Sequence, residues 1–373
     1  MERGWEFEVW FMAATEAGRY WRFDADAFNF PHRFLYGKSL NVRGATLHLN
    51  PSILRRLRAQ PAEVVLVAGG WALPTNVLLS LAQGLVCRPQ LIFWSESHLH
   101  STRRVGWAIN WLRTRLLRRY HGFAVPGELA RTYVQHYAPN RPVHLFSNTV
   151  NEALFRDTVY RLRQNREALR RGLRIPNDRR VLLIPARLRS EKGVSEFLSS
   201  LDSLPAAIKQ ATTVFIAGDG PLKERIRQQF ARPDSLDVRL MGHLEESEML
   251  KLYALADGFA LPSLYDPNPL AVVEALWASL PLLLSDRVGN HPEALRAGRN
   301  GWLFDPRSSS SICEAFLQWC AASPQALAAC GAVSLSLAEA HFETRKVVQT
   351  LLDNLLKEKL QTCAPLATHQ EQV

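Results

Sequence analysis

The feature that most constrains the fold is a regular alternation of short apolar runs with helical stretches. In the second half a helix follows each of six expected strands, at 181–186, 212–218, 238–243, 258–263, 281–286 and 301–305. The first half repeats the pattern, with strands expected at 6–13, 63–69, 90–96, 122–126 and 143–148 and a short one near 33–36. Because parallel strands need crossover connections, this alternation predicts an α/β fold with mostly parallel sheets covered by helices.

Length and one strand-free stretch predict how the chain divides. A chain of 373 residues has room for two domains. Residues 151–180 are rich in arginine and contain no sustained apolar run, which indicates a linker and an entry helix. We therefore expect a first domain at 1–172, a second at 173–332, a long terminal helix at 333–360 and a polar tail at 361–373. Residues 14–50 look irregular, and Asn50-Pro51 predicts a cap and the start of a basic helix.

Cysteine usage and the N-terminus favour a reducing, cytoplasmic compartment. The chain has five cysteines and no C-x-x-C pair, which argues against a disulfide framework or a zinc site. The opening residues, MERGWEFEVWF, lack the basic-then-apolar pattern of a signal peptide. The longest apolar run, 270–284, contains Glu274 and Pro281, which indicates a buried helix and strand rather than a membrane span.

Charge is unevenly placed along the chain. The net charge is +10, and residues 1–174 carry 25 Lys and Arg against 12 Asp and Glu. An anionic partner such as a membrane surface, a phosphorylated lipid or nucleic acid would fit this half, and so would a solvated arginine-rich surface. A helix expected at 101–120 places Trp107, Trp111 and Leu112 among arginines, a pattern typical of an interfacial helix on anionic lipid. Packing of one apolar face with solvated arginines explains it too. We expect peripheral membrane contact here and, because the aromatics form no stacking pattern, no nucleic acid.

Three strand-to-helix turns in the second half carry residues suited to a ligand. In open α/β sheets, ligands bind outside the carboxyl ends of the strands. The turns lie at 185–193, 217–221 and 265–270, and they share one sheet edge. Arg187, Lys192 and the amides of 268–270 would converge on one diphosphate there. Asn268 is expected to cap the following helix, with Pro269 at its first position.

These motifs, in this order, resemble the second domain of family 4 retaining glycosyltransferases with the GT-B fold. The resemblance covers about 173–330, and the first half is similar more loosely. The motifs that carry it are Arg187-Leu-x3-Lys192-Gly193, Gly218-Asp219-Gly220-Pro221, Gly242 after a strand, Asp266-x7-Glu274, and Ser285-Asp286-x2-Gly289-x3-Glu293 leading to Asn300-Gly301. Each motif is weak alone, whereas five in order at matching spacing are specific. The resemblance implies two Rossmann-like doubly wound domains facing across a cleft, with the terminal helix crossing back to the first.

The resemblance also implies roles for single residues. Arg187 and Lys192 would hold the diphosphate of a nucleotide-sugar donor, and Glu274 would bind ribose hydroxyls. Asp266 stands where the family has a sugar-facing glutamate, one methylene longer. Other donor-site positions that match are Gly220, Gly242, Asn268, Pro269 and Leu270. The nucleotide-sugar donor would be a co-substrate rather than a cofactor. The resemblance implies that the sugar is transferred with retention of configuration and that neither a metal nor another cofactor is needed.

On the acceptor side, two residues after the strand at 90–96 are candidates. The family often places a histidine there, and Glu96 and His98 are expected to contact the acceptor or the transferred sugar. For His98, an ordinary loop histidine is an equally good interpretation. Many relatives use a lipid-linked sugar, so a lipid-linked or polysaccharide precursor is the expected acceptor.

Other functions fit parts of the sequence. The family normally opens with one more strand and a loop, and this chain begins near the second strand. Either the true start lies upstream or this element is absent, and its absence would fit a degenerate, non-catalytic sugar-nucleotide-binding protein. A sugar-nucleotide 2-epimerase on the same fold is a third possibility. Asp24-Ala25-Asp26 spells a metal-binding motif but follows no clear strand, which favours a surface turn. The chain contains no H-E-x-x-H, no Walker loop and no G-x-G-x-x-G after a strand.

Overall fold

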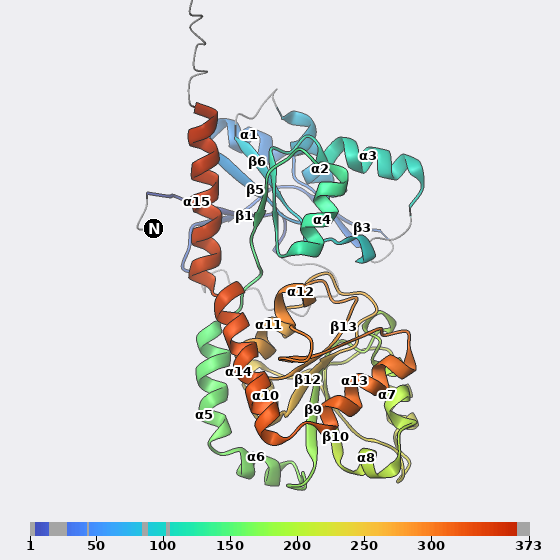
Figure 1. Cartoon of the computed structure of the whole chain (residues 1–373). Coiled ribbons are helices and arrows are strands. Elements are labelled where there is room, and N and C mark those ends of the chain that lie inside the picture. Colours follow the sequence, from blue (N-terminus) through green and yellow to red (C-terminus); the bar gives the residue numbers. More distant parts are fainter. Residues whose placement is uncertain (1–3, 15–27, 43–44, 84–88, 102–104, 364–373) are drawn as a thin grey trace, which may run out of the picture. The chain divides into compact units, whose positions relative to one another are not determined.

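The computed structural model describes residues 4–14, 28–42, 45–83, 89–101 and 105–363. It contains two compact units (Figure 1). The first comprises Met1–Ser95, Arg103–Ala124 and Val134–His144, and the second comprises Glu96–Thr102, Val125–Tyr133 and Leu145–Val373. The domain limits expected at residues 172 and 332 stay a prediction.

The second unit is built on a six-stranded parallel sheet. Its strands are β9 (Arg180–Pro185), β10 (Thr212–Ala217), β11 (Asp237–Gly242), β12 (Gly258–Leu261), β13 (Leu282–Ser285) and β14 (Gly301–Phe304). The spatial order is β11-β10-β9-β12-β13-β14, and neighbouring strands are parallel. All six expected strands are present. The order reverses at β9, which makes the sheet doubly wound and places a topological switch point beside β9 and β12.

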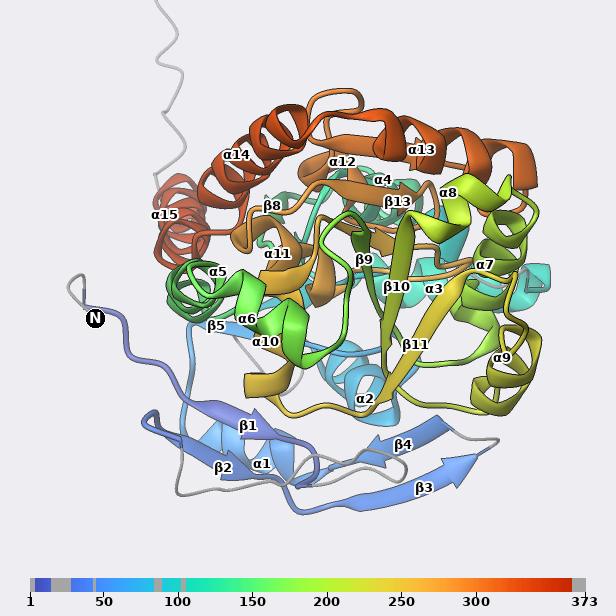
Figure 2. The same cartoon turned by 90° about the horizontal axis from the view of Figure 1, so that it is seen from below.

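Helices cover both faces of this sheet (Figure 2). The helices of the second unit are α5 (Val159–Arg163), α6 (Arg166–Gly172), α7 (Val194–Asp202), α8 (Ala206–Gln210), α9 (Lys223–Gln229), α10 (Glu246–Leu255), α11 (Leu270–Trp277), α12 (His291–Ala294), α13 (Ser309–Ala321), α14 (Pro324–His341) and α15 (Thr344–Cys363). The sheet is buried on both sides, which is why its strands are continuous apolar runs. Leu183, Phe215, Phe259 and Leu283 are at most 1 % exposed.

Two details of this unit differ from the expectation. The long terminal helix is two helices, α14 and α15, with a break at Phe342–Glu343. The arginine-rich linker is packed rather than solvated: Arg166 pairs with Asp257 at 2.6 Å, and Asp257 also accepts from the amide of Val181 at 2.8 Å. Linker arginines thus tie α6 to the first residues of the sheet.

The first unit contains a smaller sheet and two separate strand pairs. The sheet has the order β5-β6-β7-β8, formed by Val64–Val67, Gln90–Trp94, Gly122–Val125 and Val143–Leu145, and β6 is parallel to both β5 and β7. The expected strands near 6–13 and 33–36 are β1 (Val9–Phe11) and β2 (His32–Phe34), which pair with each other. An antiparallel hairpin, β3 (Lys38–Val42) and β4 (Ala45–Leu49), occupies a stretch that we expected to be irregular.

The helices of the first unit show two further differences. They are α1 (Ser52–Ala59), α2 (Pro74–Ala82) and α3 (Trp107–Leu117), so the helix expected at 101–120 is shorter, and α4 (Glu128–Tyr137) is divided between the two units at Tyr133. The expectation that Asn50 caps α1 is wrong, because Pro51 occupies the cap position without a side-chain hydrogen bond. The buried side-chain amide of Asn50 instead donates from Nδ2 to the carbonyl oxygens of Met12 at 3.0 Å and Leu35 at 3.2 Å. Those bonds fix the strand pairs against the start of α1.

Among the described residues no single helix is long and apolar enough to cross a membrane. Ser309–Ala321 together with Pro324–Glu358 passes by length and composition as a pair bent by 111°. Phe316 and Trp319 in this pair are fully buried in the core of the second unit, as expected for core helices.

Candidate functional site

A cleft of about 400 Å³ lies beyond the carboxyl end of β9, next to the start of α11. It brings together the first and third of the expected turns. Its lining residues are Pro185, Ala186, Arg187, Arg189, Glu191, Lys192, Leu261, Tyr265, Asp266, Pro267, Pro269, Leu270 and Ala271. Three cationic side chains face two carboxylates here, and the walls are otherwise apolar. Such a lining suits a ligand that carries more than one negative charge.

Lys192 is placed by a short 3₁₀ turn, Ser190–Lys192, which ends at Gly193. Gly193 has a φ of +62°, and a Cβ there would lie 2.2 Å from the carbonyl oxygen of Pro262. Only glycine accepts both conditions. The turn directs the Lys192 ammonium to Asp266, with 2.5 Å between Nζ and Oδ2.

A second loop clamps the turn that carries Asp266. The amide of Gly289 donates to the carbonyl oxygen of Asp266 at 2.9 Å, and the Asn290 side chain donates to that of Pro269 at 3.0 Å. A Cβ on Gly289 would lie 1.6 Å from the Pro267 carbonyl oxygen. Glycine at 289 therefore lets the loop after β13 approach closely and fix the acidic side chain at the edge of the cleft.

Two glycines of the middle turn, Gly218 and Gly220, lie against the backbone of the loop that carries Arg187. A Cβ on Gly218 would lie 2.1 Å from the Ala186 carbonyl oxygen, and one on Gly220 would lie 2.5 Å from that of Leu188. Gly218 also donates its amide to Gly242 at 2.7 Å. Neither Gly220 nor Gly242 lines the cleft. Gly218 and Gly220 instead let the loop after β10 pack backbone to backbone on the Arg187 loop.

The start of α11 differs from the expectation by one residue. The helix begins at Leu270, and Pro269, with extended ψ of 123°, occupies the cap position. Asn268 is therefore not the cap, because it lies one residue too early for its side chain to reach the first-turn amides. Its Nδ2 is buried and has no acceptor among the described residues. Pro269 and Leu270 do line the cleft, and Leu270 is 44 % exposed.

Glu274 lies one turn further along α11 and is mostly withdrawn from the cleft. The hydroxyl of Tyr253 donates to its Oε2 at 2.7 Å. Burial raises the pKa of Glu274, and the bond from Tyr253 opposes that shift. Tyr253 was not among the expected site residues, because its helical spacing on α10 indicates only a core residue. Arg189, Glu191 and Tyr265 were missed too, although each lies within three residues of an expected one.

Two acceptor-side candidates lie in a segment that belongs to the second unit, Glu96–Thr102. His98 is buried, and its Cδ2 would lie 3.0 Å from a Cβ on Gly289, so the ring packs against the clamped turn. Burial lowers the pKa of His98 to about 4, so the ring is neutral at neutral pH. Glu96 is exposed, and its Oε1 accepts from the Asn148 side chain at 2.7 Å. His98 therefore touches the turn of Asp266, whereas Glu96 does not line the cleft.

In the described part of the chain, no group of three or more His, Cys, Asp and Glu side chains could hold a metal ion. Asp24-Ala25-Asp26 lies outside the described residues. The thiols of Cys313, Cys320 and Cys330 are free.

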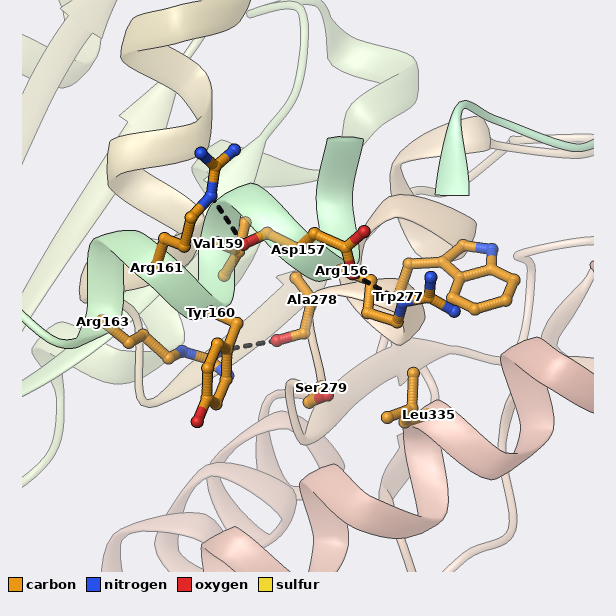
Figure 3. Close-up of a pocket in the computed structure, with 10 residues that line it drawn as sticks. All are labelled: Arg156, Asp157, Val159, Tyr160, Arg161, Arg163, Trp277, Ala278, Ser279 and Leu335. Atoms are coloured by element: carbon orange, nitrogen blue, oxygen red, sulfur yellow. Dashed lines mark hydrogen bonds and ion pairs between the residues drawn. The ribbon is translucent and has the colours of Figure 1, made fainter. Parts of the chain in front are cut away.

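A separate pocket of about 260 Å³ lies between α5, the end of α11 and α14 (Figure 3). Arg163 reaches into it and donates to the carbonyl oxygen of Ala278, the C-terminal cap of α11, at 2.6 Å. Burial lowers the pKa of Arg163 to about 10, so the group keeps its charge at neutral pH. A cation at the negative end of a helix is a stabilising arrangement. None of the expected site residues lines this pocket.

Comparison with known proteins finds similarity over the part of the chain that carries the cleft. The model of the family "Glycosyl transferases group 1" matches residues 165–330, which include every residue of the cleft. Glycogen synthase from Mycobacterium tuberculosis is 35 % identical over 135 residues, which are 36 % of this chain and 32 % of that relative. The match thus spans about a third of the length of this relative.

Solved structures match over much more of the chain. Sucrose-phosphate synthase from Thermosynechococcus elongatus superposes with a TM-score of 0.71 over 97 % of this chain and 90 % of that one, at 16 % identity. Anabaena HepE in complex with UDP superposes with a TM-score of 0.67 over 88 % and 86 %, at 17 % identity. Identities this low show the fold alone: two Rossmann-like domains with parallel sheets, the GT-B fold.

Proposed function

The chain belongs to the glycosyl transferases group 1 family through residues 165–330, and on that premise we propose that it is a nucleotide-sugar-dependent glycosyltransferase. The observation that carries the proposal is the cationic cleft at the switch point of the sheet. Arg187, Arg189 and Lys192 enter it from the loop after β9, and the start of α11 faces them. This is where a doubly wound sheet binds a phosphorylated ligand.

The reaction we propose breaks the bond between the anomeric carbon of the sugar and the diphosphate oxygen, forms a bond from that carbon to a hydroxyl oxygen of the acceptor, and transfers the hydroxyl proton to the leaving diphosphate. As that bond breaks, negative charge develops on the leaving diphosphate. Arg187, Arg189 and Lys192 would stabilise this charge, and their positions are set by the fold before the donor binds. We propose retention of configuration at the anomeric carbon, as the family resemblance implies. We also propose that no metal is required, since fixed side-chain cations supply the charge that a metal would otherwise bring. UDP-glucose is the first donor to test, because HepE has been solved with UDP and with UDP-glucose.

Sugar contacts would come from the clamped turn and its surroundings. Asp266 faces the cleft beside the cations and would accept hydrogen bonds from hydroxyls of the transferred sugar. We propose that neutral His98, which is hydrogen-bonded to the backbone of Asp266 and packs beside Gly289, contacts the transferred sugar or the acceptor. Glu274 keeps one carboxylate oxygen beyond the Tyr253 bond, and we assign it to ribose. The acceptor we propose is a lipid-linked or polysaccharide precursor at the cytoplasmic face of a membrane, and the free thiols fit that compartment.

Thermal-shift measurements against UDP-, GDP-, ADP- and dTDP-sugars test donor binding directly. A ligand that binds only the folded state raises the melting temperature, and the stabilisation grows with the logarithm of ligand concentration divided by Kd. Arg187→Ala should abolish the shift and leave the unliganded melting temperature unchanged, because the Arg187 side chain is exposed and makes no hydrogen bond or ion pair with another described residue. Arg225→Ala, an exposed arginine on α9 outside the cleft, is the matched control. An equal shift in both variants would refute the diphosphate site.

A non-catalytic sugar-nucleotide-binding protein is the second candidate, and one observation favours it. Asp266 is shorter than the family's glutamate and is already engaged by Lys192 at 2.5 Å. Donor binding with neither donor hydrolysis nor transfer to any acceptor would support it. A sugar-nucleotide epimerase would instead convert the donor with no acceptor present, which chromatography of the donor alone detects.

A further inference from the structure

Helix α3 presents an apolar outer face in the first unit. Trp107 is 83 % exposed, Trp111 58 %, and Leu112 45 %. The opposite side of the same helix is buried through Arg113, Leu116 and Leu117. The helix is therefore firmly packed, and its exposed tryptophans are not the result of a missing core. Figure 1 shows α3 at the margin of this unit with no other described element of the unit over its outer side.

Unneutralised cations continue this face toward the end of α3. Arg115, Arg118 and Arg119 are exposed and have no carboxylate within ion-pair distance among the described residues. The Arg115 guanidinium lies 5.4 Å from the Trp111 ring centre. Arg118 donates to the carbonyl of Tyr137 at 3.1 Å, and Arg119 donates to that of Ser80 at 2.6 Å. From Val105 to Gly127 the sequence contains four arginines and no aspartate or glutamate. The positive charge is therefore held in place and has no internal counter-charge.

Helical spacing puts the two kinds of side chain on one line. Trp107, Trp111 and Arg115 follow at intervals of four residues, with Arg118 one turn on, so they share the outer face. Tryptophan has a large apolar body and one polar N–H, and it prefers the boundary between acyl chains and headgroups. Arginine binds lipid phosphate bidentately. We propose that the outer face of α3 docks the first unit on an anionic lipid bilayer.

The composition of the face favours a bilayer over a protein partner. A second copy of this chain would bring the same uncompensated arginines, and like charges across an interface are destabilising. An anionic bilayer supplies negative charge across the whole length of the helix and an apolar layer beneath it. The inference extends the proposed function, since it gives the acceptor a membrane-bound source. Bilayer binding is measured without donor or acceptor, so either proposal can fail alone.

Vesicle flotation tests the docking face. The protein is floated with vesicles of phosphatidylcholine alone and with vesicles in which part of it is replaced by phosphatidylglycerol. We expect binding that requires phosphatidylglycerol and weakens with added salt. Replacing each tryptophan by alanine removes roughly 1.4 kcal/mol or more of apolar burial, so Trp107→Ala with Trp111→Ala should weaken partition by about a hundredfold. Arg115→Gln with Arg118→Gln should remove the preference for phosphatidylglycerol.

Matched controls separate docking from folding. Tyr36→Ala removes an aromatic side chain that is 77 % exposed in the same unit but far along the chain from α3, and it should leave flotation unchanged. The tryptophan variants should keep the melting temperature and the donor-induced shift of the original protein. The proposal is overturned by equal binding to both kinds of vesicle, by equal flotation of the tryptophan variant, or by light scattering that shows tryptophan-dependent dimers without lipid.

Discussion

Substitution of Lys192 by methionine is the sharpest perturbation of the cleft. Its ammonium lies 2.5 Å from Asp266 Oδ2, and the two side chains are 23 % and 10 % exposed. Without it, the Asp266 carboxylate keeps one described side-chain partner, the Ser263 hydroxyl at 3.3 Å. Removing one member of a fully buried pair costs about 3–5 kcal/mol. Because Lys192 is partly exposed and water can replace it, we expect the free energy of unfolding to fall by about 1–3 kcal/mol.

A second pair of the same chemistry provides the control. Lys223 and Asp219 also lie 2.5 Å apart, but their side chains are 31 % and 49 % exposed and neither lines the cleft. Lys223→Met should therefore cost less than about 1 kcal/mol. Adding Asp266→Asn to Lys192→Met removes the stranded charge and should recover most of the lost stability. Urea unfolding of the original protein, Lys192→Met, Asp266→Asn and the double variant gives the coupling energy between the two side chains directly.

Donor binding should not follow stability in this series. A charge-assisted hydrogen bond to phosphate is worth about 1.5–3 kcal/mol, so Lys192→Met should weaken donor affinity by roughly ten- to a hundredfold. Loss of transition-state stabilisation should lower turnover by about a further hundredfold. The double variant regains stability but not affinity, because the cation is still absent. If Lys192→Met destabilises no more than Lys223→Met, or if the double variant regains affinity, the pairing or the diphosphate assignment is wrong.

Three more predictions concern neighbouring features. Because the folded-state pKa of His98 is lowered to about 4, neutral His98 contributes to the free energy of unfolding above its unfolded pKa of about 6.5, and this contribution is lost as pH falls toward 4. Urea unfolding should therefore give a free energy about 2 kcal/mol smaller at pH 5 than at pH 7. His98→Gln should reduce that difference. Gly289→Ala would place a Cβ 1.6 Å from the Pro267 carbonyl oxygen, so it should cost at least about 1–3 kcal/mol and abolish the donor-induced thermal shift, whereas Gly172→Ala, with open space around its Cβ, should be neutral or slightly stabilising. Arg163→Met removes the cation at the C-terminus of α11, so it should lower the free energy of unfolding by about 1–2 kcal/mol. Transfer activity per folded molecule, measured over a range of donor concentrations, should be unchanged.

The sheet of the second unit was predictable because a strand buried on both faces must be apolar at every position. Leu182, Leu183 and Ile184 show this directly, since all three are fully buried. The β3–β4 hairpin leaves no such signal. Its strands alternate polar and apolar residues, and Leu40 and Leu49 remain 65 % and 42 % exposed. An exposed, alternating hairpin in a stretch rich in aromatics therefore looked irregular.

The site was predictable as far as the shared edge of parallel strands determines it. That edge brings Arg187, Lys192 and Asp266 to one cleft, as expected. The shared edge did not reveal whether Gly218 and Gly220 contact a ligand or pack against another loop. Whether a glycine touches a ligand or another loop depends on which backbone approaches its Cβ, and no local pattern encodes that. The cap of α11 was misplaced for a related reason, since Asn268 followed by Pro269 fits two registers one residue apart.

The reach of an acidic side chain depends on the backbone that carries it as well as on its length. Asp266 is one methylene shorter than the glutamate of the family, which in isolation suggests a decayed site. In the structure its turn is held by two hydrogen bonds, one from the backbone amide of Gly289 and one from the side chain of Asn290. The loop after β13 also lies so close to this turn that no Cβ fits at residue 289. The carboxylate still lines the cleft and still meets Lys192. The clamped turn therefore holds this short acid at the cleft, and Gly289 and Asn290 determine the position of the carboxylate as much as the length of its side chain does.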